Sequence, residues 1–135
     1  MTTIVTRASK GSPLSNSELD ANFENLNNDK LELIVTSITS GATITPPSGN
    51  SQYNITALAV DATFAEPSGT PEAGLKLILR LKDNGTARNL SWNSIYRAVN
   101  CTLPTQTTAG KLTYIGLVYN STDSKWDAIA VVTEV

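Results

Sequence analysis

Leucines at every second position of residues 75–82 constrain the fold of this chain more than any other feature. The segment alternates leucine with cations or isoleucine: Leu75, Lys76, Leu77, Ile78, Leu79, Arg80, Leu81, Lys82. Because successive side chains of a strand point to opposite faces, the segment predicts a strand with leucines inward and mostly cations outward. Runs rich in β-branched and aromatic residues predict further strands at 31–40, 53–64, 90–92, 95–103, 111–119 and 126–132.

Turn-forming residues separate these runs. Loops are expected at 41–51, 66–74 and 104–110, and the Asn-Gly pair in Lys82–Gly85 predicts a tight turn. Residues 120–125 join the last two predicted strands into a C-terminal hairpin. About seven short strands with loops of this length predict a mainly β chain, with an antiparallel β-sandwich or jelly-roll-like domain over 31–135.

The pattern before residue 31 is different. Residues 1–14 are polar and contain the breakers Gly11 and Pro13, so we expect an extended arm. Ser15 and Glu18 have capping-box spacing, and Leu19, Phe23 and Leu26 follow at helical spacing, which predicts a short helix over 15–30. A helix this short is marginal alone in water. Its apolar stripe therefore needs a partner, either the chain's own β domain or the same helix of sister subunits.

The charge balance argues against several classes of partner. Ten Lys and Arg stand against twelve Asp and Glu, a net charge of -2, whereas binders of nucleic acid concentrate basic charge.

Apolar runs are short, so we expect no membrane span, and the N-terminus predicts no secretion signal. Only 16% of residues are charged, while Thr, Ser and Asn make up roughly a third. That composition suits β structure and subunits that pack against neighbours.

The residues that catalysis and metal binding usually need are scarce. The chain has no histidine and one cysteine, which excludes His-dependent nucleophiles and the usual zinc sites. Phosphate-binding glycine loops and calcium loops are also missing. Asp61 and Glu66 could in principle form a glycosidase pair, but two unrelated surface charges are favoured. We therefore expect no enzyme, no catalytic residues, no cofactor and no metal. Cys101 is expected to be a small apolar residue in a strand.

Five aromatic residues allow two interpretations: Trp92, Tyr96, Tyr114, Tyr119 and Trp126. They could form a platform on which sugar rings stack, or they could fill the core or a seam between subunits. The second interpretation is favoured because each residue lies within a predicted strand.

The N-terminal segment resembles a sequence shared by many tail-fibre and capsid-decoration proteins of tailed phages. The matching pieces run through residues 6–27: Thr6-Arg7, Lys10-Gly11-Ser12-Pro13-Leu14, Glu18-Leu19-Asp20-Ala21-Asn22-Phe23 and Leu26-Asn27. The likeness covers about a sixth of the chain. Parts of residues 103–127, including Thr113-Tyr-Ile-Gly116 and Trp126-Asp127, also resemble the ends of some phage structural proteins.

This resemblance implies a virion protein in which residues 1–30 dock on the particle and the β domain of 31–135 projects, commonly as a homotrimer. The expected partners are other copies of the chain and the major capsid protein or tail proteins. The expected docking and oligomer residues are Arg7, Lys10, Leu14, Leu19, Phe23 and Leu26. Because no shaft separates the helix from the β domain, a capsid decoration or cement protein is favoured. The alternatives are a short tail fibre or tail appendage that binds a host surface glycan, and a free carbohydrate-binding module.

Overall fold

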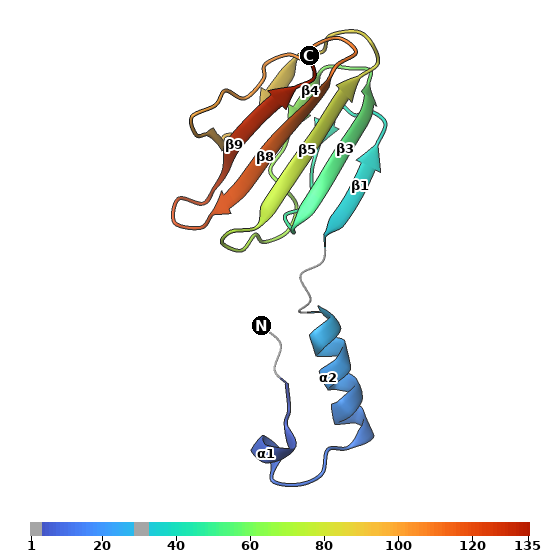
Figure 1. The fold of residues 1–135 in the computed structure, drawn as a ribbon, viewed down its shortest axis with the longest axis vertical. Coiled ribbons are helices and arrows are strands. Elements are labelled where there is room, and N and C mark those ends of the chain that lie inside the picture. The colour runs from blue at the N-terminus through green and yellow to red at the C-terminus, as the bar shows by residue number, and fades with distance from the viewer. Residues whose placement is uncertain (1–3, 29–32) are drawn as a thin grey trace. The chain divides into compact units, whose positions relative to one another are not determined.

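The computed structural model describes residues 4–28 and 33–135 (Figure 1). Along the sequence, the chain divides into two compact units, residues 1–32 and residues 33–135. The predicted helix and the first predicted strand both run into residues 29–32, which lie outside the described residues.

Within residues 4–28, the N-terminal unit contains two helices, α1 (Arg7–Lys10) and α2 (Asn16–Asn28). The predicted capping box of α2 is confirmed. Glu18 accepts hydrogen bonds from the Ser15 backbone at 2.7 Å and the Ser15 hydroxyl at 2.9 Å, while the Glu18 backbone donates to that hydroxyl at 3.3 Å. These contacts satisfy backbone donors that the first turn of a helix leaves free.

The prediction of an extended arm is wrong for part of residues 4–14, because they contain the short helix α1. Thr6 caps it by accepting from the Ser9 backbone at 3.1 Å, and the Ser9 hydroxyl accepts in return from the Thr6 backbone. Gly11 ends the helix with φ 72°, a left-handed conformation that glycine adopts without a steric penalty. Local side-chain capping explains why four residues can form a helix that periodicity does not reveal.

The regular secondary structure in the described part of the second unit consists of strands joined by loops. They are β1 (Ile34–Ile38), β2 (Thr43–Ile44), β3 (Ser51–Leu58), β4 (Ala62–Phe64), β5 (Lys76–Asp83), β6 (Leu90–Trp92), β7 (Tyr96–Ala98), β8 (Leu112–Asn120) and β9 (Lys125–Thr133). A large mixed sheet has the order β1-β3-β5-β8-β9-β7, and a small sheet has the order β2-β4-β6. The mainly β prediction and the C-terminal hairpin, now β8 and β9, are confirmed.

The prediction of antiparallel pairing is wrong for most of the unit, and the sandwich or jelly-roll arrangement stays a prediction. From β1 to β7 the chain alternates between the sheets, so that β1, β3 and β5 pair in parallel, as do β2, β4 and β6. Strand β7 also pairs in parallel, with β9. Parallel neighbours need a crossover between them. Here the crossover from one strand to the next passes through the other sheet. Among the described strands, the antiparallel pairs are β5–β8 and β8–β9.

One core draws side chains from both sheets, and Figure 1 shows β4 of the small sheet behind the large one. The alternation over residues 75–82 is confirmed. Leu77, Leu79 and Leu81 are at most 1% exposed, whereas Lys76, Ile78 and Lys82 are exposed. In β3 a register shift between Ile55 and Leu58 allows both residues to be fully buried, although they lie three positions apart.

The predicted turn after Lys82 is organised by Asp83, which is buried. Its carboxylate accepts hydrogen bonds from the Thr107 hydroxyl, the Gly110 amide at 2.7 Å and the Gly85 amide at 2.9 Å. Burial pushes the pKa of Asp83 up, but these bonds together outweigh it, so the pKa lies below its ordinary value. Gly85 has φ 93°, as expected for an Asn-Gly turn. Asp83 thus ties the end of β5 to the loop before β8.

Candidate functional site

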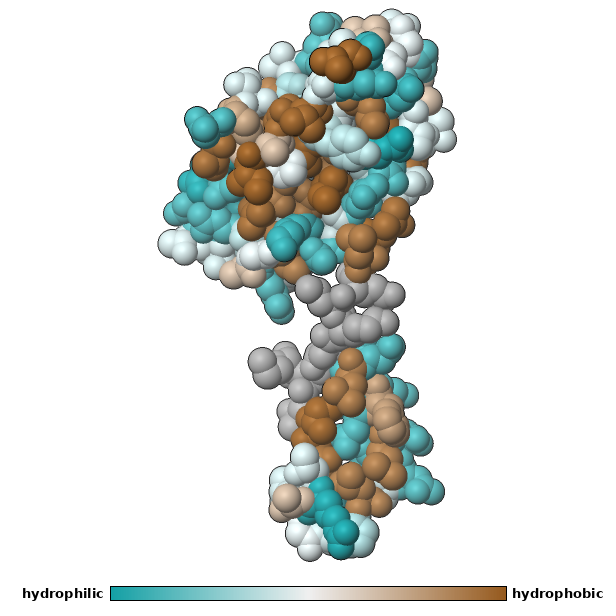
Figure 2. Space-filling model, viewed as in Figure 1, coloured by the Kyte–Doolittle hydropathy of each residue, from teal (hydrophilic) through white to brown (hydrophobic). Residues whose placement is uncertain are grey.

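The apolar stripe predicted on α2 is exposed. Leu19 is 40%, Phe23 69% and Leu26 59% exposed, and apolar residues are visible along this helix in Figure 2. All three lie on one face because they are spaced by four and three residues. This face is the first candidate assembly surface of the molecule, named here the helix stripe.

The arm before α2 is fastened to one side of the helix. The side-chain amide of Asn22 donates to the Val5 carbonyl at 2.7 Å and accepts from the Val5 amide at 2.9 Å. Lys10 forms an ion pair with Glu18. The Lys10 hydrogen bond, followed by those from Ser15, lowers the pKa of Glu18 to about 2. The arm therefore has a defined conformation and leaves the helix stripe exposed.

The predicted docking residues lie partly in the helix stripe and partly in the segment before α2. Leu19, Phe23 and Leu26 form the helix stripe, Arg7 is exposed on α1, and Lys10 is engaged with Glu18. Leu14 is half-buried in the segment between the two helices. That they contact another protein remains a prediction.

A second apolar surface lies on the outer face of the large sheet and was missed by the sequence analysis. Here named the outer band, it comprises Ile78 of β5, Leu112, Tyr114 and Val118 of β8, and Ile129, Ala130 and Val132 of β9. Val132 is 60% and Ile129 59% exposed. Figure 2 shows these apolar side chains gathered on the face toward the viewer. The signal in the sequence was that β8 and β9 carry apolar residues at consecutive positions, not only at alternate ones.

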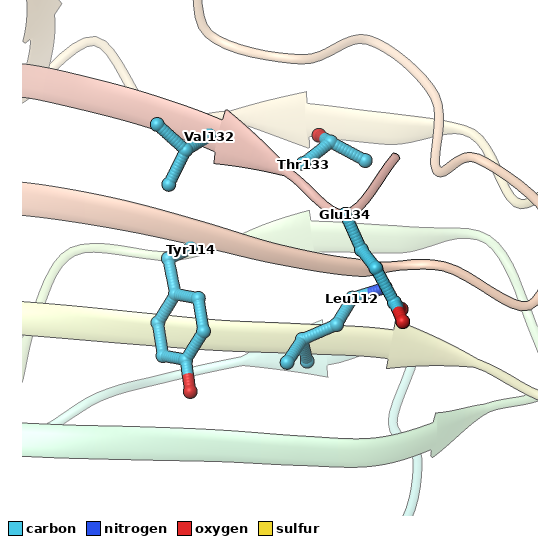
Figure 3. Close-up of a pocket in the computed structure, with 5 residues that line it drawn as sticks. All are labelled: Leu112, Tyr114, Val132, Thr133 and Glu134. Atoms are coloured by element: carbon cyan, nitrogen blue, oxygen red, sulfur yellow. The ribbon is translucent and has the colours of Figure 1, made fainter.

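The outer band is hollowed at one end. Figure 3 shows a depression with the ring of Tyr114 on one side and the carboxylate of Glu134 at the other end. Leu112, Val132 and Thr133 complete its lining. Glu134 is held there because its backbone donates to the Leu112 carbonyl at 2.8 Å and its carboxylate accepts from the Leu112 amide at 3.2 Å. The depression is mostly apolar with one acidic group at its edge.

An ion-pair cluster borders the other end of β9. Arg97 donates to Asp127 at 2.7 and 3.0 Å and to Asp123 at 2.8 Å. The Arg97 hydrogen bonds are the main reason that the pKa of Asp127 is below its ordinary value. The cluster joins β7, β9 and the turn between β8 and β9, and so holds the edge of the sheet together.

The aromatic residues are mainly core residues, which confirms the favoured interpretation for Trp126. Trp126 is fully buried and Tyr96 is 6% exposed. Trp92 stacks on Phe64 with ring centroids 4.1 Å apart, and its indole donates to the Pro104 carbonyl. Of the five aromatics considered for sugar stacking, Tyr114 alone is classed as exposed, at 39%. A platform of several aromatic rings is not formed by these five residues.

Asp61 and Cys101, which were considered as candidates for a chemical role, make hydrogen bonds within the fold. The carboxylate of Asp61 accepts from the Asn89 side chain and backbone, both at 2.9 Å, and these bonds lower its pKa. Cys101 lies in a bend after β7, not in a strand as predicted, and its thiol donates to the Ala128 carbonyl. Within 4–28 and 33–135, no three His, Cys, Asp or Glu residues group as a metal site.

In the part of the chain that the structure describes, neither helix is long and apolar enough to cross a membrane. Comparisons with protein families, with curated proteins and with solved structures found no match to this chain.

Proposed function

We propose that this chain is a homotrimeric structural protein of a bacteriophage virion, attached to the capsid as a decoration or cement protein through its N-terminal unit. The observation that carries the proposal is the helix stripe, in which Phe23 is 69% exposed. Large apolar side chains gathered on a short helix favour contact with a partner over contact with water. The stripe lies within the segment whose sequence resembles phage virion proteins.

The organisation of the arm supports docking as a preformed unit. The Val5–Asn22 and Lys10–Glu18 contacts hold the arm on α2 without covering Phe23 or Leu26. A surface that is ordered before it binds loses less conformational entropy on binding. The N-terminal unit thus offers a fixed apolar face to the particle or to sister helices.

A structural role is proposed in place of a catalytic one. The chain contains no histidine, and the buried carboxylate of Asp83 and the exposed carboxylate of Asp61 both serve as hydrogen-bond acceptors that organise loops. A carbohydrate-binding module has less support, because Trp92, Tyr96 and Trp126 pack in or against the core.

Imaging of purified phage particles tests the proposal. Gold-labelled antibody against the β unit should decorate the head in many copies, and deletion of the gene should weaken the capsid without reducing adsorption. Label confined to the tail, with loss of adsorption on deletion, would replace the capsid assignment by a tail appendage. Absence of the protein from purified particles would contradict a virion role altogether.

A further inference from the structure

The outer band lies between a basic and an acidic border on the same face of the large sheet. On the β5 side are three cations, Lys76, Arg80 and Lys82. On the β9 side are the carboxylates of Glu134 and of Asp127, which is bonded to Arg97, together with Lys125, whose ammonium donates to the Ser94 carbonyl at 2.8 Å. Within the described ranges, the ion pairs involve Lys10, Arg97 and their partners, and none involves the three β5 cations. The basic border is therefore available to an acidic partner.

The strand register places the two borders level with each other. Lys82 pairs with Leu112 across β5 and β8, and Leu112 holds Glu134 by two hydrogen bonds. At the other end, Val118 is the register partner of both Lys76 and Asp127. Lys82 and Glu134 thus lie at the same height with Leu112 between them, whereas at the other end the carboxylate level with Lys76 is already paired with Arg97.

This arrangement is complementary to itself under one kind of symmetry. A rotation axis parallel to β8 brings the β5 side of one copy against the β9 side of the next and leaves the height along the strands unchanged. Lys82 then faces Glu134 of the adjacent copy, while the apolar bands meet near the axis. The alternative is an axis that is parallel to the sheet but perpendicular to its strands. Such an axis places the β5 cations of one copy against the β5 cations of the other, which is repulsive.

We infer that the outer face of the large sheet is a contact between copies of this chain, arranged around an axis parallel to β8 with Lys82 paired to Glu134 of the adjacent copy. The inference rests on the proposed homotrimer and assigns its β-domain interface, separate from the helix stripe. The occupant is a second copy because it brings a carboxylate, Glu134, to the height of Lys82, which forms no ion pair within the described part of its own chain. Asp127 is already bonded to Arg97, so the Lys82–Glu134 pair is the contact to test.

A charge-reversal cycle on the full chain tests the inference. Light scattering over a range of concentrations should show that Lys82→Glu and Glu134→Lys each raise the dissociation constant by about tenfold or more, because like charges then meet at every contact of the trimer. The double variant should recover the wild-type constant. Glu72→Lys is the matched control for Glu134→Lys, since it makes the same change of charge at an exposed loop residue that does not belong to the outer band. Circular dichroism confirms that each variant is folded.

A second variant removes apolar area without changing either border residue. Tyr114→Asp places a carboxylate on β8, the middle strand of the outer band, and should dissociate the oligomer. A trimer unaffected by the single reversals and by Tyr114→Asp would overturn the inference and leave the proposed homotrimer intact. A wild-type chain that stays monomeric would overturn both, and would leave another virion protein as the occupant of this face.

Discussion

The side-chain amide of Asn22 holds the backbone of Val5 through both of its polar atoms, with the carbonyl accepting from the Val5 N–H and the NH2 donating to the Val5 carbonyl. One residue of α2 thereby fastens the arm in the way that a neighbouring strand would. Asparagine is a poor helix former, so its presence within α2 is explained by this contact.

Replacing Asn22 should release the arm. Asn22→Ala removes both hydrogen bonds, each worth about 1 kcal/mol, and should increase the rate of tryptic cleavage after Arg7 and Lys10 several-fold. Asn27→Ala is the control, because Asn27 is exposed on the same helix. Equal cleavage rates for the two variants would show that the Val5–Asn22 contact does not hold the arm.

Phe23 should matter for assembly and not for folding of the β unit. Phe23→Asp places a charge in the helix stripe and should weaken oligomer formation or attachment to the particle, while fluorescence from buried Trp126 stays unchanged. Ala21→Asp is the control, because Ala21 is exposed and lies nearly opposite the stripe on α2. Normal assembly and attachment of the Phe23→Asp variant would show that the helix stripe is not an interface.

Two neighbouring positions of β5 should respond in opposite ways to the same substitution. Leu79→Asp buries an unpaired carboxylate where the exposed fraction is 0%, which costs several kcal/mol and should unfold the β unit. Ile78→Asp, on the outer face at 39% exposure, should leave the unit folded. Urea denaturation followed by tryptophan fluorescence compares them, and a stable Leu79→Asp protein would contradict the assigned strand facing.

Asp83 should make the stability of the β unit depend on acid pH. Its folded pKa lies below the unfolded value of about 3.9, so its contribution is fully present above that value and is lost as the pH falls through the folded pKa. Asp83→Asn should lower the free energy of unfolding at pH 7 by about 1–3 kcal/mol and reduce the loss of stability on acidification. Urea titrations at pH 7 and pH 3 measure both effects. An unchanged pH dependence in Asp83→Asn would show that another carboxylate causes the acid sensitivity.

Local patterns predicted the elements that local interactions determine. The capping box of Ser15 and Glu18, the alternating leucines of β5 and the C-terminal hairpin are each specified by residues close in sequence, and each is confirmed. The helix α1 was missed because four residues are too few for a periodic signal, although the polar pair Thr6 and Ser9 caps it.

Strand pairing was not predictable in the same way. A period of two gives the facing of a strand but not the direction of its neighbour, and the alternation between sheets from β1 to β7 depends on contacts distant in sequence. Strand β2 has only two residues, and the register shift in β3 breaks the alternation that would have identified Leu58 as inward. The outer band required the pairing of β5, β8 and β9, because only the register brings Lys82 level with Glu134.

The proposed homotrimer requires that the purified protein assembles by itself, and its mass in solution, measured by light scattering on the full-length chain, tests this. We predict a particle with three times the 14.4 kDa mass of one chain, persisting as the protein is diluted into the micromolar range. A mass of one chain at every concentration would contradict the proposed homotrimer and the contact between copies at the outer band.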